Sequence, residues 1–484
     1  MNLKLERTAP QAVEADALII LEFEDSSSLP PGYEPMREGG ELTGKPAEFA
    51  LIHHAPGYKA HRLLMAGAGP RQKFGTAEVR KIAGSATRFL KARSIRAAAF
   101  LLSEDFSTPD HVAAVVEGAL LGDFECDVHK SDRKDSRFLD SLTVVVGSDD
   151  PALETGLERG RVLGESQNFA RELANEPPNV LTPLTLAARA QEMARETGLD
   201  CEILDQPRMQ QLGMGALLGV AQGSAEPPCL IILRYSPEGK GASKAHLGLV
   251  GKGVTFDTGG ISIKPSEHMD KMKFDMAGGA AVIGAMRAIA RLKPSIHVTG
   301  MIPAVENMPG SKAQRPGDIV TSFSGKTIEI LNTDAEGRLI LADALAYAQK
   351  LGCTHLVDAA TLTGAIVVAL GHHNTGVFSN DAALQERWRH ASRHEGERMW
   401  EMPVEPEYRE QLKTTSADIA NIGGRDGGSV TAAMFLKEFV GETPWLHLDI
   451  AGTAWIDDDK PWMAKGPTGL PVRSFVALAT QWRD

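Results

Sequence analysis

Short apolar runs alternate with helical stretches along the first 150 residues of the chain. Apolar and β-branched residues predict strands at 17–23, 48–53, 62–66, 95–102 and 142–147. Apolar positions at helical spacing predict helices at 77–92 and 109–122. Strands that alternate with helices are typical of an α/β domain, so we expect one in this part of the chain.

A long helical pattern follows, from residue 151 to about residue 174, and leads into the segment ANEPPNVLTP. The prolines and asparagines of that segment stop a helix. A chain of this length usually forms more than one domain. We therefore expect a smaller N-terminal α/β domain at 1–150, a linking helix at 151–175 and a larger C-terminal domain at 176–484.

The second half of the chain continues with strand–loop–helix units. Its apolar runs predict buried strands at 230–235, 247–251, 296–302, 327–331, 355–358 and 446–450. Helical patterns follow at 278–292, 339–350 and 430–440. The predicted fold class is α/β, and we expect the larger domain to have a mixed central sheet flanked by helices.

Composition excludes several classes of protein. The 484 residues are 43% hydrophobic and 24% charged, which is typical of a globular protein. The net charge of −12 argues against a general nucleic-acid binder, which needs a basic face to displace counterions from phosphates. The N-terminus lacks the pattern of a signal peptide, and no run of about 18 apolar residues predicts a membrane helix.

Cysteine usage indicates the compartment. The four cysteines lie far apart and form no Cys-x-x-Cys pair: Cys126, Cys201, Cys229 and Cys353. A disulfide framework or a structural zinc knot is therefore not expected. Sparse, unpaired cysteines fit a reducing cytosol, so we expect a cytoplasmic protein.

Two stretches place charged residues just after apolar strands, among Gly, Thr, Ser and Ala. They read LVGKGVTFDTGGISIKPSEHMDKMKFDMAGGAA and LNTDAEGRLILADALA, and begin at Leu249 and Leu331. Ligands of open α/β sheets bind outside the carboxyl ends of the strands. We expect the charges of both stretches to meet at that edge: Lys252, Asp257, Asp275, Asp334 and Glu336.

Four carboxylates in one cleft repel each other unless cations join them. Divalent metals suit carboxylate ligands, and two ions that share a water form a hydrolytic site. An aspartate that follows a strand is, taken alone, more often a helix cap or a turn former. The segment GKGVTFDTGG matches neither common phosphate-binding glycine motif. The joint placement of the charges favours a two-metal site.

Both stretches resemble the leucine (cytosol) aminopeptidase family. NTDAEGRL at 332–339 looks like the signature of that family, and VGKGVTFDTGG with ISIKPS and MKFDM looks like its second diagnostic block. The resemblance extends through DAATLTGA, ADIANIGG and HLDIAGTAW and covers roughly residues 170–480. It implies an aminopeptidase that removes single N-terminal residues from peptides through a hydroxide that bridges two divalent metals.

The resemblance also implies the roles of individual residues. The metal ligands would be Lys252, Asp257, Asp275, Asp334 and Glu336. Asp257 and Glu336 would bridge both ions, the tighter site would add Lys252 and Asp275, and the more exchangeable site would add Asp334. Read from the residues alone, Lys252 is a charge-balancing partner for Asp257, because an ammonium has no lone pair to donate.

Two further cations and a substrate pocket follow from the same similarity. Lys264 would stabilise the oxyanion, and Arg338 would hold a bicarbonate ion as general base. The apolar pocket would be formed by Met272, Thr361, Leu362, Gly364, Ala451 and Ala454. Ala454 stands where some relatives have a larger residue, often methionine, so we expect broad activity on Leu, Met and similar residues.

Metal identity and assembly complete the expectations. Oxygen ligands without histidine suggest magnesium or manganese, whereas the resemblance implies zinc or manganese. We expect manganese in the active enzyme, with zinc possible in the tighter site, and a homohexamer by resemblance. The alternatives are an inactive relative that binds DNA, a two-metal phosphoesterase, and a nucleotide site in the N-terminal domain, which shows no phosphate motif.

Overall fold

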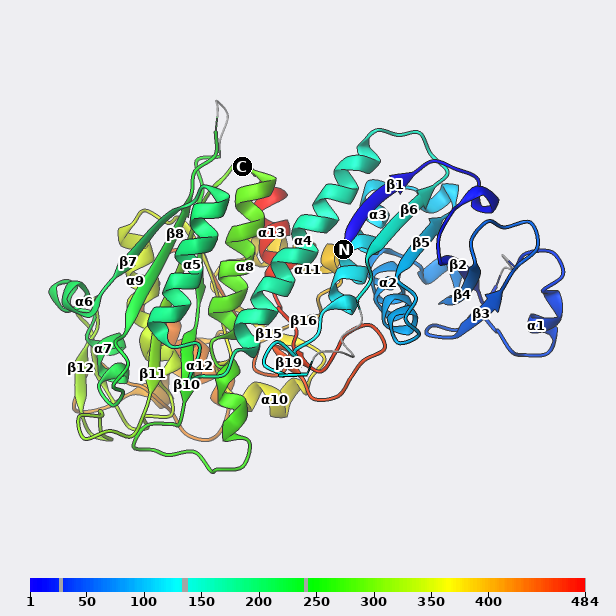
Figure 1. The fold of residues 1–484 in the computed structure, drawn as a ribbon. Helices are drawn as coiled ribbons and strands as arrows, with labels where there is room; N and C mark the ends of the chain where they lie inside the picture. The colour runs from blue at the N-terminus through cyan, green and yellow to red at the C-terminus, as the bar shows by residue number, and fades with distance from the viewer. Residues whose placement is uncertain (26–28, 133–137, 239–242, 484) are drawn as a thin grey trace. The chain divides into compact units, whose positions relative to one another are not determined.

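The chain is described by a computed structural model that covers residues 1–25, 29–132, 138–238 and 243–483 (Figure 1). It divides into two compact units, one formed by Met1–Asn168 with Asp457–Lys465 and the other by Phe169–Ile456 with Gly466–Asp484. Each unit is built around a mixed sheet with helices, so the predicted two-domain α/β fold is confirmed.

The first unit contains a six-stranded sheet in the order β1-β6-β5-β2-β4-β3. Neighbouring strands are parallel except for β3 against β4. The strands are β1 (Asn2–Glu6), β2 (Ala17–Phe23), β3 (Phe49–His53), β4 (Arg62–Gly69), β5 (Ala97–Leu102) and β6 (Ser141–Val146). The five predicted strands are present, and β1 is an additional one.

Among the described residues, three α-helices lie wholly within this unit, and two of them pack on each other and on one face of the sheet. The helices are α1 (Glu34–Glu38), α2 (Thr76–Lys91) and α3 (Pro109–Asp123). Helices α2 and α3 approach closely at Gly118, where an added Cβ would lie 2.0 Å from the carbonyl oxygen of Arg80. Glycine is needed there because any side chain would push the two helices apart.

The predicted linking helix is α4 (Ala152–Asn175), and the division between the two units falls inside it. Its last turn ends just before the proline pair Pro177–Pro178. Proline lacks the backbone N–H that a continued helix would need, which explains the end of α4 at this point.

The second unit contains a nine-stranded mixed sheet. Its order is β16-β15-β18-β14-β9-β11-β8-β7, and β10 pairs with part of β11. The strands are β7 (Asp200–Leu204), β8 (Cys229–Tyr235), β9 (His246–Gly251), β10 (Gly253–Asp257), β11 (His297–Asn307), β14 (His355–Ala360), β15 (Thr375–Ser379), β16 (Met399–Glu401) and β18 (Trp445–Asp449). The central strands β11, β9, β14 and β18 are parallel, so their carboxyl ends share one edge.

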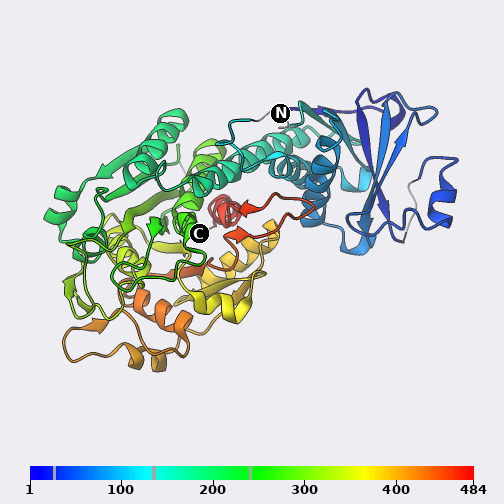
Figure 2. The ribbon, with the colours of Figure 1, turned by 60° about the horizontal axis from the view of Figure 1, so that its bottom comes forward.

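Helices cover both faces of this sheet (Figures 1 and 2). Val250 points into a core shared with α7 (Gly215–Ala221), α9 (Gly337–Lys350) and α12 (Gly428–Lys437). The next residue, Gly251, points the other way, and an added Cβ would lie 2.4 Å from the carbonyl oxygen of Gly278 in α8 (Ala277–Leu292). Helix α8 packs with α5 (Pro183–Thr197) and α13 (Val472–Thr480).

The remaining helices and strands are peripheral. The helices are α6 (Gln206–Leu212), α10 (Gly364–Leu370) and α11 (Ala382–Glu395). The strands β19 (Trp455–Ile456) and β20 (Gly466–Pro467) form a small antiparallel pair. Among the described residues, no helix is both long enough and apolar enough to cross a bilayer.

Two predictions about the strands need correction. The predicted strand 327–331 is shorter, as β13 (Thr327–Glu329), and lies in a separate three-stranded sheet with β12 (Ile319–Thr321) and β17 (Ile419–Ala420). Asp257, which was expected in a loop after β9, is instead the last residue of a second strand, β10.

Candidate metal centre

The predicted ligands come from separate elements and meet near one edge of the central sheet. Lys252 lies between β9 and β10, and Asp257 ends β10. Asp275 follows the 3₁₀ helix Met269–Phe274. Asp334 lies in the loop after β13, and Glu336 precedes the first turn of α9. Five residues from separate elements and loops therefore place their side chains near the same edge of the sheet.

Three of the carboxylates converge. One oxygen each from Asp257, Asp334 and Glu336 lie within 4.8 Å of one another. Lys264 contacts two of them, with its Nζ 2.9 Å from Asp257 Oδ2 and 2.6 Å from Asp334 Oδ1. Asp257 and Glu336 are buried, so their charges face each other with little screening by water.

Lys252 joins the fourth carboxylate to this group. Its Nζ lies 2.8 Å from Asp275 Oδ1 and 2.7 Å from Glu336 Oε1, and it donates to the carbonyl oxygen of Thr361 at 2.9 Å. Asp257, the partner expected from the residues alone, helps to raise the pKa of Lys252, but the direct contact to Asp257 comes from Lys264. The two lysines divide the four carboxylates into two pairs.

The pKa values reflect the burial of these groups. Burial raises the pKa of Asp275 well above its ordinary value, with Lys252 acting against the shift and Glu336 adding to it. Burial and the nearby Asp257 raise the pKa of Glu336, and burial raises the pKa of Asp334. Burial alone would lower the pKa of Lys252, but Asp275 and Glu336 outweigh it and raise the pKa overall. Burial is the largest cause of each raised carboxyl pKa, because it disfavours the charged form.

The residues fit a pair of divalent ions. The Oδ2 atom of Asp275 is buried and has no hydrogen-bond partner among the described residues. A buried, unpartnered carboxylate oxygen is costly unless a cation or a donor faces it. Four carboxylates stand against two lysine ammoniums, and hard or borderline cations prefer such oxygen donors. Asp257, Asp275, Asp334 and Glu336 could therefore hold metal, with Lys252 beside them.

Arg338 lies in the first turn of α9 and is buried. Its Nη1 donates to the carbonyl oxygen of Asn421 at 2.8 Å, whereas its Nε is buried with no hydrogen-bond partner in the described part of the chain. Burial lowers the pKa of Arg338 to about 10, although Glu336 and Asp449 act in the opposite direction. The guanidinium remains a cation at neutral pH and has donors left for a planar anion.

Five of the six predicted substrate residues lie after β14 and β18. Thr361 donates to Asp275 Oδ1 at 2.7 Å, which ties the start of that segment to the metal site. The backbone N–H groups of Leu362 and Ala451 both donate to Asp449 Oδ1, each at 3.2 Å. The other three are Met272 in the 3₁₀ helix before Asp275, Gly364 at the start of α10, and Ala454, which is only 1% exposed.

Three buried residues that organise the site were not predicted as site residues. Asp449 accepts the hydrogen bonds just described, and Asn421 accepts from the backbone N–H of Leu331 through its Oδ1 at 2.8 Å. Asn307 donates to Asp257 Oδ1 at 2.8 Å. Asn307 is a polar residue at the carboxyl end of a parallel strand, which is the signal that identified the ligands. The predicted strand ended five residues too early to reveal it.

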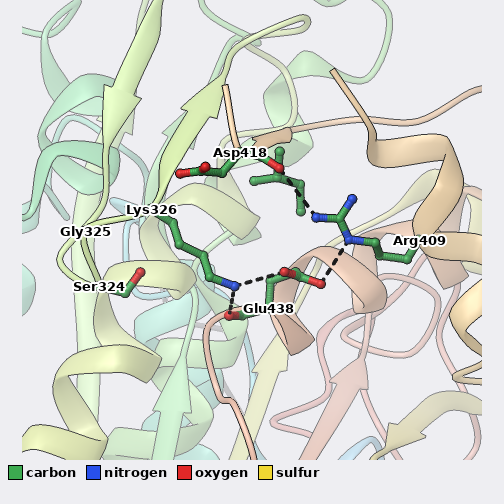
Figure 3. Close-up of a pocket in the computed structure, with 7 residues that line it drawn as sticks. Ser324, Gly325, Lys326, Arg409, Asp418 and Glu438 are labelled. Carbon is green, nitrogen blue, oxygen red and sulfur yellow. Dashed lines mark hydrogen bonds and ion pairs between the residues drawn. The ribbon is translucent and has the colours of Figure 1, made fainter. Parts of the chain in front are cut away.

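The pocket in Figure 3 lies apart from these residues. Its volume is about 440 Å³, and it is lined by Ser324, Gly325, Lys326, Arg409, Asp418, Ile419 and Glu438. Lys326 and Arg409 both donate to the carboxylate of Glu438, at 2.9 and 3.2 Å. These charges satisfy one another, and no member of the acidic cluster lines the pocket.

Comparison with known proteins agrees with this geometry. The model of the catalytic domain of the cytosol aminopeptidase family matches residues 168–476, and that of its N-terminal domain matches residues 33–133. A probable cytosol aminopeptidase of Solibacter usitatus (strain Ellin6076) is 60% identical over 483 residues, which is 100% of both chains.

Two solved structures are similar over nearly the whole chain. A mutant of tomato leucine aminopeptidase has a TM-score of 0.90 and 33% identity, covering 100% of this chain and 97% of its own. The bottromycin maturation enzyme BotP in complex with Mn has a TM-score of 0.86 and 33% identity, covering 98% and 99%. The chain therefore belongs to the cytosol aminopeptidase family and is a metal-dependent aminopeptidase, a peptidase of the hydrolase class.

Proposed function

We propose that the protein removes the N-terminal residue from peptides, preferring Leu, Met and similar residues, with two divalent ions held by Lys252 and the acidic cluster. The observation that carries this proposal is the convergence of Asp257, Asp334 and Glu336, with the unpartnered Asp275 Oδ2 beside them. When bound, two such ions lower the pKa of a shared water and polarise a carbonyl.

Two cationic side chains, Lys264 and Arg338, complete the proposed chemistry. The Nζ of Lys264 faces the cluster. The side chain of Lys264 is 23% exposed, so its Nζ can reach a substrate oxygen. We assign it to the developing oxyanion, where a fixed positive charge stabilises the transition state more than the ground state. Arg338 has a buried Nε with no partner among the described residues, which supports a bound bicarbonate as general base.

The proposed metal ions would also explain the choice of peptide end. The lone pair of a neutral α-amine is a ligand for an ion held by the acidic cluster, and a blocked N-terminus lacks that lone pair. Thr361 and the Leu362 and Ala451 backbone, fixed through Asp275 and Asp449, would form the wall that receives the first side chain. This arrangement supports cleavage of one residue at a time from a free N-terminus.

Metal removal tests the proposed function. Full-length protein stripped with a chelator should lose activity on leucine anilide and recover most of it with Mn²⁺, and less with Zn²⁺, Mg²⁺ or Co²⁺, because oxygen-rich sites suit manganese. A phosphate monoester assayed with the same metals should not be hydrolysed. If no metal restores peptidase activity, or if the phosphate ester is the better substrate, the proposal is wrong.

Substrate breadth should depend on Ala454. The variant Ala454→Met fills space next to the proposed pocket, so the ratio of kcat/KM for phenylalanine anilide to that for leucine anilide should fall by about 10-fold. Each variant is its own control, because the ratio cancels any loss of folded enzyme. An unchanged ratio would mean that Ala454, which is 1% exposed, packs in the core and does not limit the pocket.

Three predictions are carried forward as proposals, and only the first of them rests on the resemblance alone. They are the homohexamer, the cytoplasmic location, and the assignment of zinc or manganese to each of the two positions. The predicted boundaries at 150 and 175 are likewise proposals for where the functional domains begin and end.

A further inference from the structure

Asn307 contacts both segments that carry most of the acidic cluster. Asp257 ends β10, and Asp334 lies in the loop that precedes α9. Thr333 also joins the two segments through its hydrogen bonds with Gly259 and Ser262. Asn307 is the last residue of β11, next to β10 in the sheet, and is 2% exposed. It is therefore buried where the two segments meet.

Both amide protons of Asn307 are used across this junction. Its Nδ2 donates to Asp257 Oδ1 at 2.8 Å and to the carbonyl oxygen of Thr333 at 3.0 Å. Both partners are acceptors, so only the NH₂ end of the amide can face them. The backbone carbonyl oxygen of Asn307 accepts from the backbone N–H of Thr258 at 3.0 Å. Asn307 thus contacts Thr258 and Thr333, which adjoin the ligands Asp257 and Asp334 in the chain. It also contacts Asp257 directly.

The contact decides which oxygen of Asp257 is offered to the cluster. Asp257 Oδ1 accepts from Asn307 and from the backbone N–H of Gly259, both at 2.8 Å. With Oδ1 engaged, Oδ2 is the atom that faces Lys264 at 2.9 Å. The same amide fixes Thr333, directly before Asp334 in the chain. A change at Asn307 would remove one restraint from each carboxylate at once, leaving Gly259 on Asp257 Oδ1 and Ser262 on Thr333.

We propose that Asn307 is a positioning residue that fixes the separation of Asp257 and Asp334 and so sets the metal affinity of the centre. This inference rests on the proposed two-metal function. Groups that orient ligands through hydrogen bonds usually change metal affinity or activity by about 10- to 100-fold when they are removed. The space around Asn307 is tight, since a Cβ added at Gly260 would lie 2.8 Å from its Oδ1. The amide is therefore held in one orientation.

The test compares two variants that each remove buried hydrogen bonds from the β10–β11 pair. Asn307→Leu keeps the size of the side chain and loses both donors. Thr255→Val is the matched control, because Thr255 is 1% exposed and donates to the carbonyl oxygen of Val305 at 3.3 Å without joining the loops. Mn²⁺ binding to metal-stripped, full-length protein is measured by titration calorimetry, and Tm is measured for each variant.

We expect Asn307→Leu to raise the Kd for Mn²⁺ by about 10- to 100-fold, while Thr255→Val stays within about twofold of the wild-type value. If Asn307→Leu does not fold, Asn307→Ser should show the same weakening, because its hydroxyl is too short to reach both acceptors. Wild-type Mn²⁺ affinity in the Asn307 variant, or equal weakening in the Thr255 variant, would overturn the proposal. Failure of the wild-type protein to bind Mn²⁺ would instead refute the proposed function.

Discussion

Replacing Glu336 by glutamine should lower kcat/KM on leucine anilide by at least about 10³-fold, because the reaction needs both ions and a neutral amide is a poor ligand for either. Glu336 is 1% exposed, and its carboxylate lies within 4.8 Å of oxygens from Asp257 and Asp334. It is also one of the two carboxylates that contact Lys252, so it touches both halves of the cluster.

The matched control for this prediction is Glu306→Gln. Glu306 is a half-buried glutamate of β11 that accepts from Ser224 and lies outside the acidic cluster. The same chemical change there should leave kcat/KM within about twofold, since Glu306 accepts from Ser224 and is not one of the converging carboxylates. Metal content after dialysis against Mn²⁺ should fall only in the Glu336 variant. A Glu336→Gln enzyme with wild-type turnover would remove the basis for a metal centre at this place.

The fold was predictable because burial on a parallel sheet leaves a clear pattern. The run 247–251 has no polar side chain and forms the central strand β9, and the apolar pair Leu356–Val357 lies in the central strand β14. The segment 327–331 has similar residues but forms a short peripheral strand, because whether a strand joins the central sheet depends on contacts far away in the sequence. Helix α11 was not predicted, because its outer face is mostly polar and its apolar pattern is weak.

The convergence of the carboxylates was also predictable, since charges at the ends of parallel strands meet at one edge. The sequence did not predict which carboxylates Lys252 and Lys264 contact. Lys252 is closer in sequence to Asp257 than to Glu336, but the peptide between β9 and β10 directs its side chain toward α9. Hydrogen bonds such as that from Asn307 to Asp257 join residues 50 positions apart, and no local pattern reports them.

Replacing Lys264 by methionine should lower kcat by about 10²- to 10³-fold with little change in KM, as expected for a donor that acts mainly in the transition state. Lys264 carries one of the two ammoniums that face the carboxylates, and Asp257 and Glu336 raise its pKa although burial alone would lower it. Its positive charge is therefore present throughout the working pH range. Methionine keeps the length of the side chain and removes only the charge and the donors.

Metal binding separates this role from simple charge balance. Removing an ammonium from beside Asp257 and Asp334 leaves their charges free, so Mn²⁺ should bind as tightly as in the wild type or more tightly. Lys312→Met, an exposed lysine of the same unit, controls for loss of a surface charge. A Lys264 variant that loses Mn²⁺ affinity and activity in parallel would show that Lys264 supports the ligands instead of the oxyanion. Full activity with tighter Mn²⁺ binding would show that Lys264 only balances the charge of the carboxylates in the metal-free protein.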